Sequence, residues 1–177
     1  MLSNFNYTGE VKISNSYNNN SLSKTFFNNG TKTLFKIYSL ALLGQVTPSL
    51  LPSNVRIIGN TSETVMEDLS AIDSGEDLLK TSSVSIIKEY IEKSNDGQII
   101  PTIRITTSLS REMFNSIDKF KTVYIILENT SVGTDKKLAY VKLVEEDVNT
   151  FKSIISSTGV NNQLIITWDL SISNKSN

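Results

Sequence analysis

The sequence contains neither cysteine nor histidine. Without Cys there can be no disulfide framework and no thiol nucleophile, and without either residue the usual zinc sites cannot form. The absence of His also excludes Ser-His-Asp triads, imidazole acid–base catalysis and histidine pH switches. Because the commonest catalytic groups are missing, we predict that the protein is not an enzyme and binds no cofactor.

An excess of charge of one sign is also missing. The chain has 17 basic and 18 acidic residues, a net charge of -1, and no run rich in Lys and Arg. Proteins that bind nucleic acids carry a basic patch or stripe, so we expect no nucleic-acid partner.

Long apolar segments are absent as well. The longest apolar run, residues 34–43, is interrupted by Lys36 and Ser39 and is shorter than the about 20 residues that span a bilayer. The first ten residues lack the basic and apolar regions of a secretion signal. We therefore expect a protein without a membrane partner and without a targeting signal of its own.

Uncharged polar residues take the place of the missing charge and apolar content. Asn and Ser make up about a quarter of the chain, and apolar residues make up 38%. A length of 177 residues suits one domain with a genuine core. We predict a single domain over residues 1–177 with a polar but weakly charged surface.

Residues 162–172 contain the clearest strand pattern. Leu164, Ile166, Trp168 and Leu170 alternate with polar residues, as in a strand with one buried and one solvated face. The only Trp of the chain lies in the middle of the apolar row, which predicts a central core strand. Shorter alternating segments predict strands at residues 8–14 and 54–58.

The middle of the chain predicts two hairpins. Residues 82–93 and 98–108 flank a turn at 94–97 that contains Asp-Gly. A change of face between Ile86 and Ile87 predicts either burial on both sides or a β-bulge. Pro101 lacks an N–H, so at least the start of the second strand should lie at an edge. Residues 121–128 and 136–144 form a more apolar hairpin, expected in the middle of a sheet.

Three segments have helical features. Residues 32–43 form the best helix candidate, because Thr31 can cap its start and Gly44 can take the left-handed conformation after its end. Its wide apolar stripe predicts packing on a sheet or, alternatively, insertion into a groove of a partner. Residues 145–156 predict a short helix or an extended crossover, and residues 108–120 predict the opening of a short helix.

About seven strands with turns between them predict a mainly β fold, an antiparallel β-sandwich of the jelly-roll or Ig-like kind, with one inserted helix at residues 32–43. Residues 15–23, rich in Asn and Ser, predict a mobile arm. Residues 61–80 are polar and acidic and predict a long loop that could contact a partner.

No group of residues predicts catalysis or metal binding. Two acidic clusters could in principle supply a glycosidase pair, but they lie in loop-like sequence, and solvated surface charge is the favoured interpretation. The first cluster surrounds Gly75 but lacks the ligand order of an EF-hand, so we predict no calcium site. The two clusters are Asp73, Glu76 and Asp77, and Glu145, Glu146 and Asp147.

Four aromatic residues on predicted strands could form a carbohydrate platform. At core spacing, packing with polar tips at the rim is the favoured interpretation. These residues are Tyr90, Tyr124, Tyr140 and Trp168.

The order of features resembles a known class of protein. An Asn-Asn-Gly-Thr turn precedes a helix that ends at Gly44, Pro52 precedes a strand, the middle is β-rich, and the Trp168 strand leads to a polar stop. This arrangement, with the Asn/Ser-rich composition, resembles the small virion structural proteins of tailed bacteriophages, particularly the crAss-like podoviruses. The resemblance implies localisation in the virion and assembly in symmetric copies with other virion proteins, without catalytic residues.

The sequence therefore predicts a non-enzymatic virion protein, an auxiliary capsid (decoration) protein that contacts its neighbours through polar loops. One alternative is a ring component of the tail or collar. An alternative of another class is a carbohydrate-binding β-sandwich module.

Overall fold

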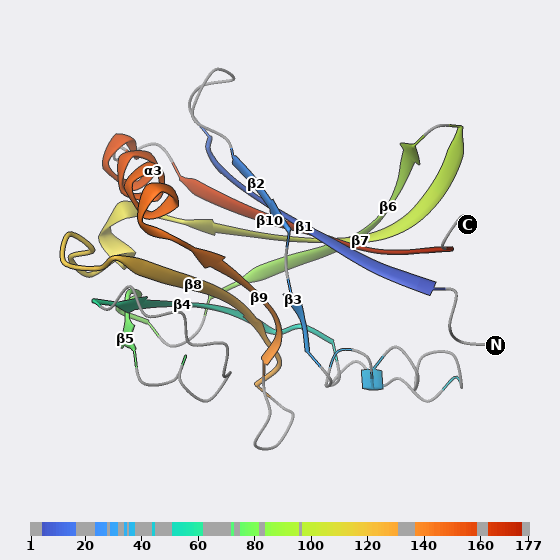
Figure 1. Ribbon diagram of the computed structural model, residues 1–177, viewed down its shortest axis with the longest axis horizontal. Helices are drawn as coiled ribbons and strands as arrows, with labels where there is room; N and C mark the ends of the chain where they lie inside the picture. The colour runs from blue at the N-terminus through green and yellow to red at the C-terminus, as the bar shows by residue number, and fades with distance from the viewer. Residues whose placement is uncertain are drawn as a thin grey trace.

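The computed structural model describes residues 5–16, 24–27, 29–31, 34, 36–37, 44, 51–61, 72, 75–81, 84–95, 97–130, 137–158 and 163–174. These residues form two five-stranded antiparallel sheets that face each other (Figure 1). The predicted mainly β sandwich is confirmed.

Sheet A has the strand order β2-β1-β10-β7-β6. Its strands are β1 (Phe5–Asn15), β2 (Lys24–Phe27), β6 (Ile86–Asn95), β7 (Gln98–Leu109) and β10 (Leu164–Asn174). Sheet B has the order β3-β9-β8-β4-β5. Its strands are β3 (Asn29–Gly30), β4 (Asn54–Asn60), β5 (Glu76–Asp77), β8 (Thr122–Glu128) and β9 (Lys137–Leu143).

Strand β10 lies in the middle of sheet A, paired with β1 on one side and β7 on the other. Its apolar row faces the interior between the sheets, where Trp168 is only 1% exposed. The prediction of a central core strand is therefore confirmed. Alternation explains the burial, because a period of two places every second side chain of a strand on the same face.

The β8–β9 hairpin occupies the interior of sheet B, as its apolar sequence predicts. Strand β8 is buried along its whole length, between β4 and β9. A register shift between Leu127 and Glu128 lets both Leu138 and Ala139 turn into the core. An irregularity of this kind inserts one extra residue into a strand and breaks its alternation.

The β6–β7 hairpin has an unbroken register from Ile86 opposite Thr107 to Asn95 opposite Gln98. The predicted turn is confirmed, with Gly97 at φ 76°, but the predicted bulge or two-sided burial is not. Instead β6 is an edge strand that leaves Ile87 exposed. The start of β7 pairs only with β6, because the pairing with β10 begins at Thr102, so the edge position predicted from Pro101 is confirmed.

The helix α3 (Glu145–Ser157) joins β9 to β10 and packs against β1, β8 and β9, at one end of the sandwich (Figure 1). Its buried residues Val148, Phe151 and Ile154 follow helical spacing, so the helical alternative for this segment is confirmed. Between β7 and β8 only a short 3-10 helix η2 (Arg111–Met113) forms.

The predicted helix at residues 32–43 lies mostly outside the described residues. Within them, Leu34 and Ile37 are helical and buried in the core. The Leu34 N–H donates to Thr31 Oγ1 at 3.3 Å, and Gly44 has φ 67°. The N-cap predicted at Thr31 and the left-handed conformation predicted for Gly44 are therefore confirmed, while residues 38–43 lie outside the described residues.

Residues 61–80 are not simply a long loop. Ile72 is helical and buried against Ile58, Tyr124 and Ile126, on the face of sheet B that points away from sheet A. After Gly75 the chain forms β5 and then buries Leu78 and Leu79 in the main core. The sequence did not predict this burial, because the segment is acidic and the spacing of its apolar residues matches neither a strand nor a helix. The short turn predicted near Val65 lies outside the described residues.

Candidate interaction surface

The described part of sheet A carries an exposed apolar patch on the β6–β7 hairpin. Tyr90 and Ile99 are 64% and 67% exposed, and Ile103, directly opposite Tyr90, is 38% exposed. Their positions in the register place all three on the same face as the core residue Leu170. Figure 1 shows why they lack cover, since the hairpin runs past the end of sheet B and curls away from it. We call Tyr90, Ile99 and Ile103 the hairpin patch.

Strand β6 is also a sheet edge, since in the described part of the chain it pairs with β7 alone. An edge strand presents unpaired backbone N–H and C=O groups to whatever lies beside it. Four charged residues of β6, Lys88, Glu89, Glu92 and Lys93, interrupt its apolar ones. Charged residues on an edge strand limit indiscriminate pairing with other strands.

A cluster of ion pairs lies on the other face of sheet A, which points away from sheet B. The Arg104 guanidinium donates two hydrogen bonds to the Asp169 carboxylate, both of 2.8 Å. Lys93 Nζ lies 2.9 Å from Asp169 Oδ2 and 2.7 Å from Glu10 Oε2. We call Glu10, Lys93, Arg104 and Asp169 the outer ion cluster.

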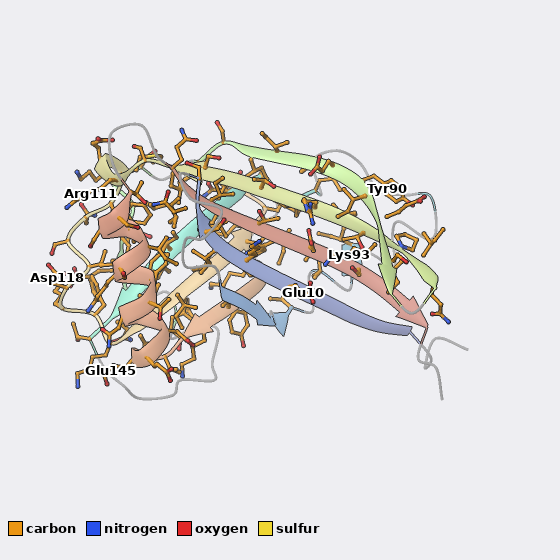
Figure 2. All side chains as sticks on the ribbon, turned by 90° about the horizontal axis from the view of Figure 1, so that it is seen from above. Glu10, Tyr90, Lys93, Arg111, Asp118 and Glu145 are labelled. Atoms are coloured by element: carbon orange, nitrogen blue, oxygen red, sulfur yellow. The ribbon has the colours of Figure 1, made fainter. Side chains whose placement is uncertain are left out.

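The outer ion cluster bends the hairpin. Lys93 and Glu10 lie on β6 and β1, three strands apart in sheet A, a separation of about 14 Å in a flat sheet. Because their side chains meet, the end of β6 must curl over the outer face, and Figure 2 shows Lys93 reaching over β10 toward Glu10. The same curl leaves Asp169 only 8% exposed.

The charges within the cluster stabilise one another. Burial alone would raise the pKa of Asp169, but the hydrogen bonds and charges of Arg104 and Lys93 hold this pKa below its ordinary value. Burial alone would lower the pKa of Lys93, but its contacts with Glu10 and Asp169 raise it. Asp169 thus stays an anion with both oxygens hydrogen-bonded, and it holds Arg104 of β7 and Lys93 of β6 against β10. We call this role the clamp of the hairpin.

The acids singled out in the sequence lie at two separate places. Glu76 and Asp77 are exposed on β5, where Glu76 pairs with Lys119 at 2.6 Å and Asp77 with Arg56 at 2.7 Å. Asp73 lies outside the described residues. The acids of the other cluster, Glu145, Glu146 and Asp147, occupy the first turn of α3, where the partial positive charge of the helix N-terminus favours them. Across the described residues no group of three or more carboxylates could hold a metal ion.

The four singled-out aromatic residues do not form one platform. Trp168 is in the core, while Tyr124 and Tyr140 meet on the outer face of sheet B with ring centroids 6.4 Å apart. Burial raises the pKa of the Tyr124 hydroxyl, and Tyr140 adds to this effect. The packing interpretation is confirmed for Trp168 and Tyr124 and wrong for Tyr90, whose edge position exposes it.

The predicted arm at residues 15–23 is anchored at its start. Asn15 belongs to β1 and its amide donates to Ser157 Oγ at 3.2 Å. Ser16 and Gln163 exchange two hydrogen bonds of 2.9 Å. Residues 17–23 lie outside the described residues.

The outer ion cluster was missed by sequence reasoning, although alternation does place Glu10 and Asp169 on solvated faces. Nothing in the local pattern says which strands become neighbours. The change of face at Ile86 and Ile87 did signal an exposed apolar residue on β6, but that residue is Ile87, on the face opposite the hairpin patch. Nothing in the sequence signalled the patch itself.

No protein-family model, no curated protein and no solved structure matches the chain. In the part of the chain that the structure describes, no helix is both long and apolar enough to cross a lipid bilayer.

Proposed function

We propose that the protein is a non-enzymatic structural component of a tailed-bacteriophage virion, an auxiliary capsid protein that contacts neighbouring subunits through the β6–β7 hairpin. The observation that carries the contact role is the hairpin patch, where apolar side chains of β6 and β7 lie exposed on the hairpin that forms one edge of sheet A. Exposed apolar residues that gather on one element mark interaction sites more often than scattered ones do.

The virion setting is supported by the feature order and the Asn/Ser-rich composition of the sequence. The architecture suits this role, because a sandwich with a continuous core is a rigid support for a projecting hairpin. The outer ion cluster adds to this rigidity by fixing the curl of the hairpin before any partner binds, which lowers the entropy cost of association.

The test is quantitative mass spectrometry of purified virus particles from the source of this sequence. We expect the chain in many copies per particle, and Ile99→Ser should lower its incorporation about tenfold or more. Lys12→Glu, on exposed strand surface away from the hairpin, is the control and should incorporate normally. A wild-type chain absent from the particles would overturn the proposal, and the copy number would separate a capsid protein from a tail or collar ring.

One observation favours the carbohydrate-binding alternative. Tyr90 is exposed, and its hydroxyl donates to Glu92 Oε1 at 3.4 Å, so an exposed aromatic ring and a hydrogen-bond acceptor for sugar hydroxyls occur on neighbouring residues of β6. A glycan array probed with the wild-type chain and with Tyr90→Ala separates this alternative from subunit contact. Binding by the wild type that Tyr90→Ala abolishes would support the carbohydrate site.

A further inference from the structure

We propose that the β6 edge binds a second copy of this chain, in a two-fold symmetric dimer whose two β6 strands pair antiparallel with Tyr90 at the centre. The proposal rests on the proposed function only in taking the hairpin as a contact surface, and its test needs no virus particle. The product would be one continuous sheet of ten strands, two copies of the five-stranded sheet A.

The backbone of β6 has the groups that such pairing needs. Asn95 and Gln98 flank the two-residue turn, and residues in that position exchange hydrogen bonds with each other. Hydrogen-bonded and non-hydrogen-bonded pairs alternate along an antiparallel ladder. Counting back from Asn95, the odd-numbered residues of β6 therefore direct their N–H and C=O groups toward β7. Lys88, Tyr90 and Glu92 direct theirs toward the open edge. Pro101 agrees with this alternation, because it lies opposite Glu92, where β7 donates no hydrogen bond to β6.

The side chains along this edge are complementary to themselves. With Tyr90 at the two-fold axis, Lys88 lies opposite the partner subunit's Glu92, and Glu92 opposite the partner subunit's Lys88. Directly opposite residues of unlike charge stabilise an antiparallel pair. All three side chains are exposed, and Lys88, which donates one hydrogen bond to the Pro52 carbonyl at 2.9 Å, keeps two further N–H donors.

Neighbouring registers are less favourable. An axis at Glu89 would place two carboxylates directly opposite each other. An axis at Ile91 would pair Glu89 with the partner subunit's Lys93, but Lys93 is already held by Glu10 and Asp169. The axis at Tyr90 leaves the outer ion cluster intact. It also gives a partner of opposite charge to Lys88 and Glu92, the two exposed charged residues that share a face with Tyr90.

Apolar contacts favour the same axis. Leu170, Ile103 and Tyr90 form one row across sheet A, buried at Leu170 and exposed at Tyr90. Figure 2 shows Tyr90 at the outer margin of the sheet, on β6. The partner subunit's Tyr90 and Ile103 would continue this row, so that the two rings and the two Ile103 side chains cover one another.

Sedimentation velocity of the full chain tests the dimer. We expect a species of twice the 19.7 kDa chain mass. Lys88→Glu alone and Glu92→Lys alone should each raise the dimer dissociation constant about tenfold or more, because two attractive pairs become repulsive. The double variant should return to within about threefold of the wild type, since it restores both pairs in reverse.

Mixing the two single variants gives a sharper result. Lys88→Glu chains are acidic at both positions and Glu92→Lys chains are basic at both, so an affinity tag on one should capture the other. Lys12→Glu, the same charge change elsewhere on sheet A, is the control and should dimerise normally. Circular dichroism of each variant confirms that it is folded.

Disulfide cross-linking tests the register, because the chain has no Cys of its own. Tyr90→Cys should form an oxidised dimer, since opposite residues in such a pair have Cα atoms about 5.5 Å apart. Ile91→Cys should not. Preferential cross-linking of Ile91→Cys, or a dimer insensitive to the charge changes, would overturn the proposed pairing.

Failure of the dimer and failure of the virion role give different results. A wild-type chain that sediments as a monomer at millimolar concentration but occurs in virus particles would overturn the dimer alone. A dimer whose chain is absent from particles would overturn the proposed function alone.

Discussion

The Asp169 carboxylate shows how one residue connects distant parts of the chain. It belongs to β10, yet its partners Arg104 and Lys93 come from β7 and β6, and Lys93 continues to Glu10 on β1. A carboxylate that is only 8% exposed must be paired, because burying an uncompensated charge costs several kcal/mol. Arg104 lies directly opposite Asp169 in the sheet, whereas the contact with Lys93 requires the curl of the hairpin.

We expect Asp169→Asn to lower the free energy of unfolding by about 2 kcal/mol. This is below the about 3 to 5 kcal/mol typical of breaking a fully buried pair, because Arg104 and Lys93 still reach solvent. Urea unfolding followed by fluorescence of the single Trp measures the change. Asp118→Asn, a matched change at an exposed carboxylate, should have little effect, and equal losses in both variants would contradict the clamp.

The pKa shifts of Asp169 and Lys93 predict how stability depends on pH. Since the folded chain lowers the pKa of Asp169, its contribution is complete above the unfolded value of about pH 4 and is lost as the pH falls through the folded pKa. Since it raises the pKa of Lys93, that contribution is complete below about pH 10 and is lost as the pH rises through the folded pKa. The acid-side loss should be smaller in Asp169→Asn, and an unchanged acid profile would contradict this assignment.

At the scale of elements, a glycine brings β4 and the segment before β8 together. A methyl group built on Gly59 would lie 2.5 Å from Phe120 Cγ, and Phe120 is buried in the main core. Close approach of this kind leaves no room for a side chain, so the glycine near the end of β4 is explained by packing rather than by a turn.

Gly59→Ala should therefore cost about 1 to 3 kcal/mol, in the range of overpacked cores. Thr61→Ala, at the nearby exposed position, should cost less than about 0.5 kcal/mol. Combining Gly59→Ala with Phe120→Leu provides the decisive measurement. If the ring contact is the cause, the double variant loses less stability than the sum of the two single variants.

At the scale of the whole molecule, two segments predicted to be peripheral, residues 15–23 and 61–80, are partly attached to the folded sandwich. Asn15 and Ser16 are bonded to Ser157 and Gln163, so the arm hypothesis applies only to residues after Ser16. Leu78 and Leu79 are core residues, so the acidic segment that ends beside them cannot be treated as a free contact loop over its full length.

Replacing residues 17–22 by a short Gly-Ser linker should leave the unfolding midpoint nearly unchanged and reduce incorporation into particles. The linker leaves the bonded residues Asn15 and Ser16 in place, which a deletion of residues 15–23 would remove. A replacement variant with normal stability and normal incorporation would contradict the arm hypothesis.

The fold class and most strands could be predicted from the amino-acid sequence, because alternation records which side chains of a strand are buried. The N-cap at Thr31 and the positive φ of Gly44 and Gly97 could also be predicted from the sequence, because capping and positive φ depend on a few adjacent residues. The strand of Trp168 was predicted as a core strand for the same reason.

Which strands become neighbours could not be predicted from the sequence, and the order of the strands sets which side chains are exposed at the surface. Tyr90 and Trp168 are both aromatic residues on alternating strands, yet one is exposed and the other buried, because β6 lies at the edge of sheet A and β10 in its middle. In the same way, the outer ion cluster joins charges more than 60 residues apart, Arg104 with Asp169 and Glu10 with Lys93. Local patterns carry no record of such pairings, since strand order depends on the packing of the whole chain.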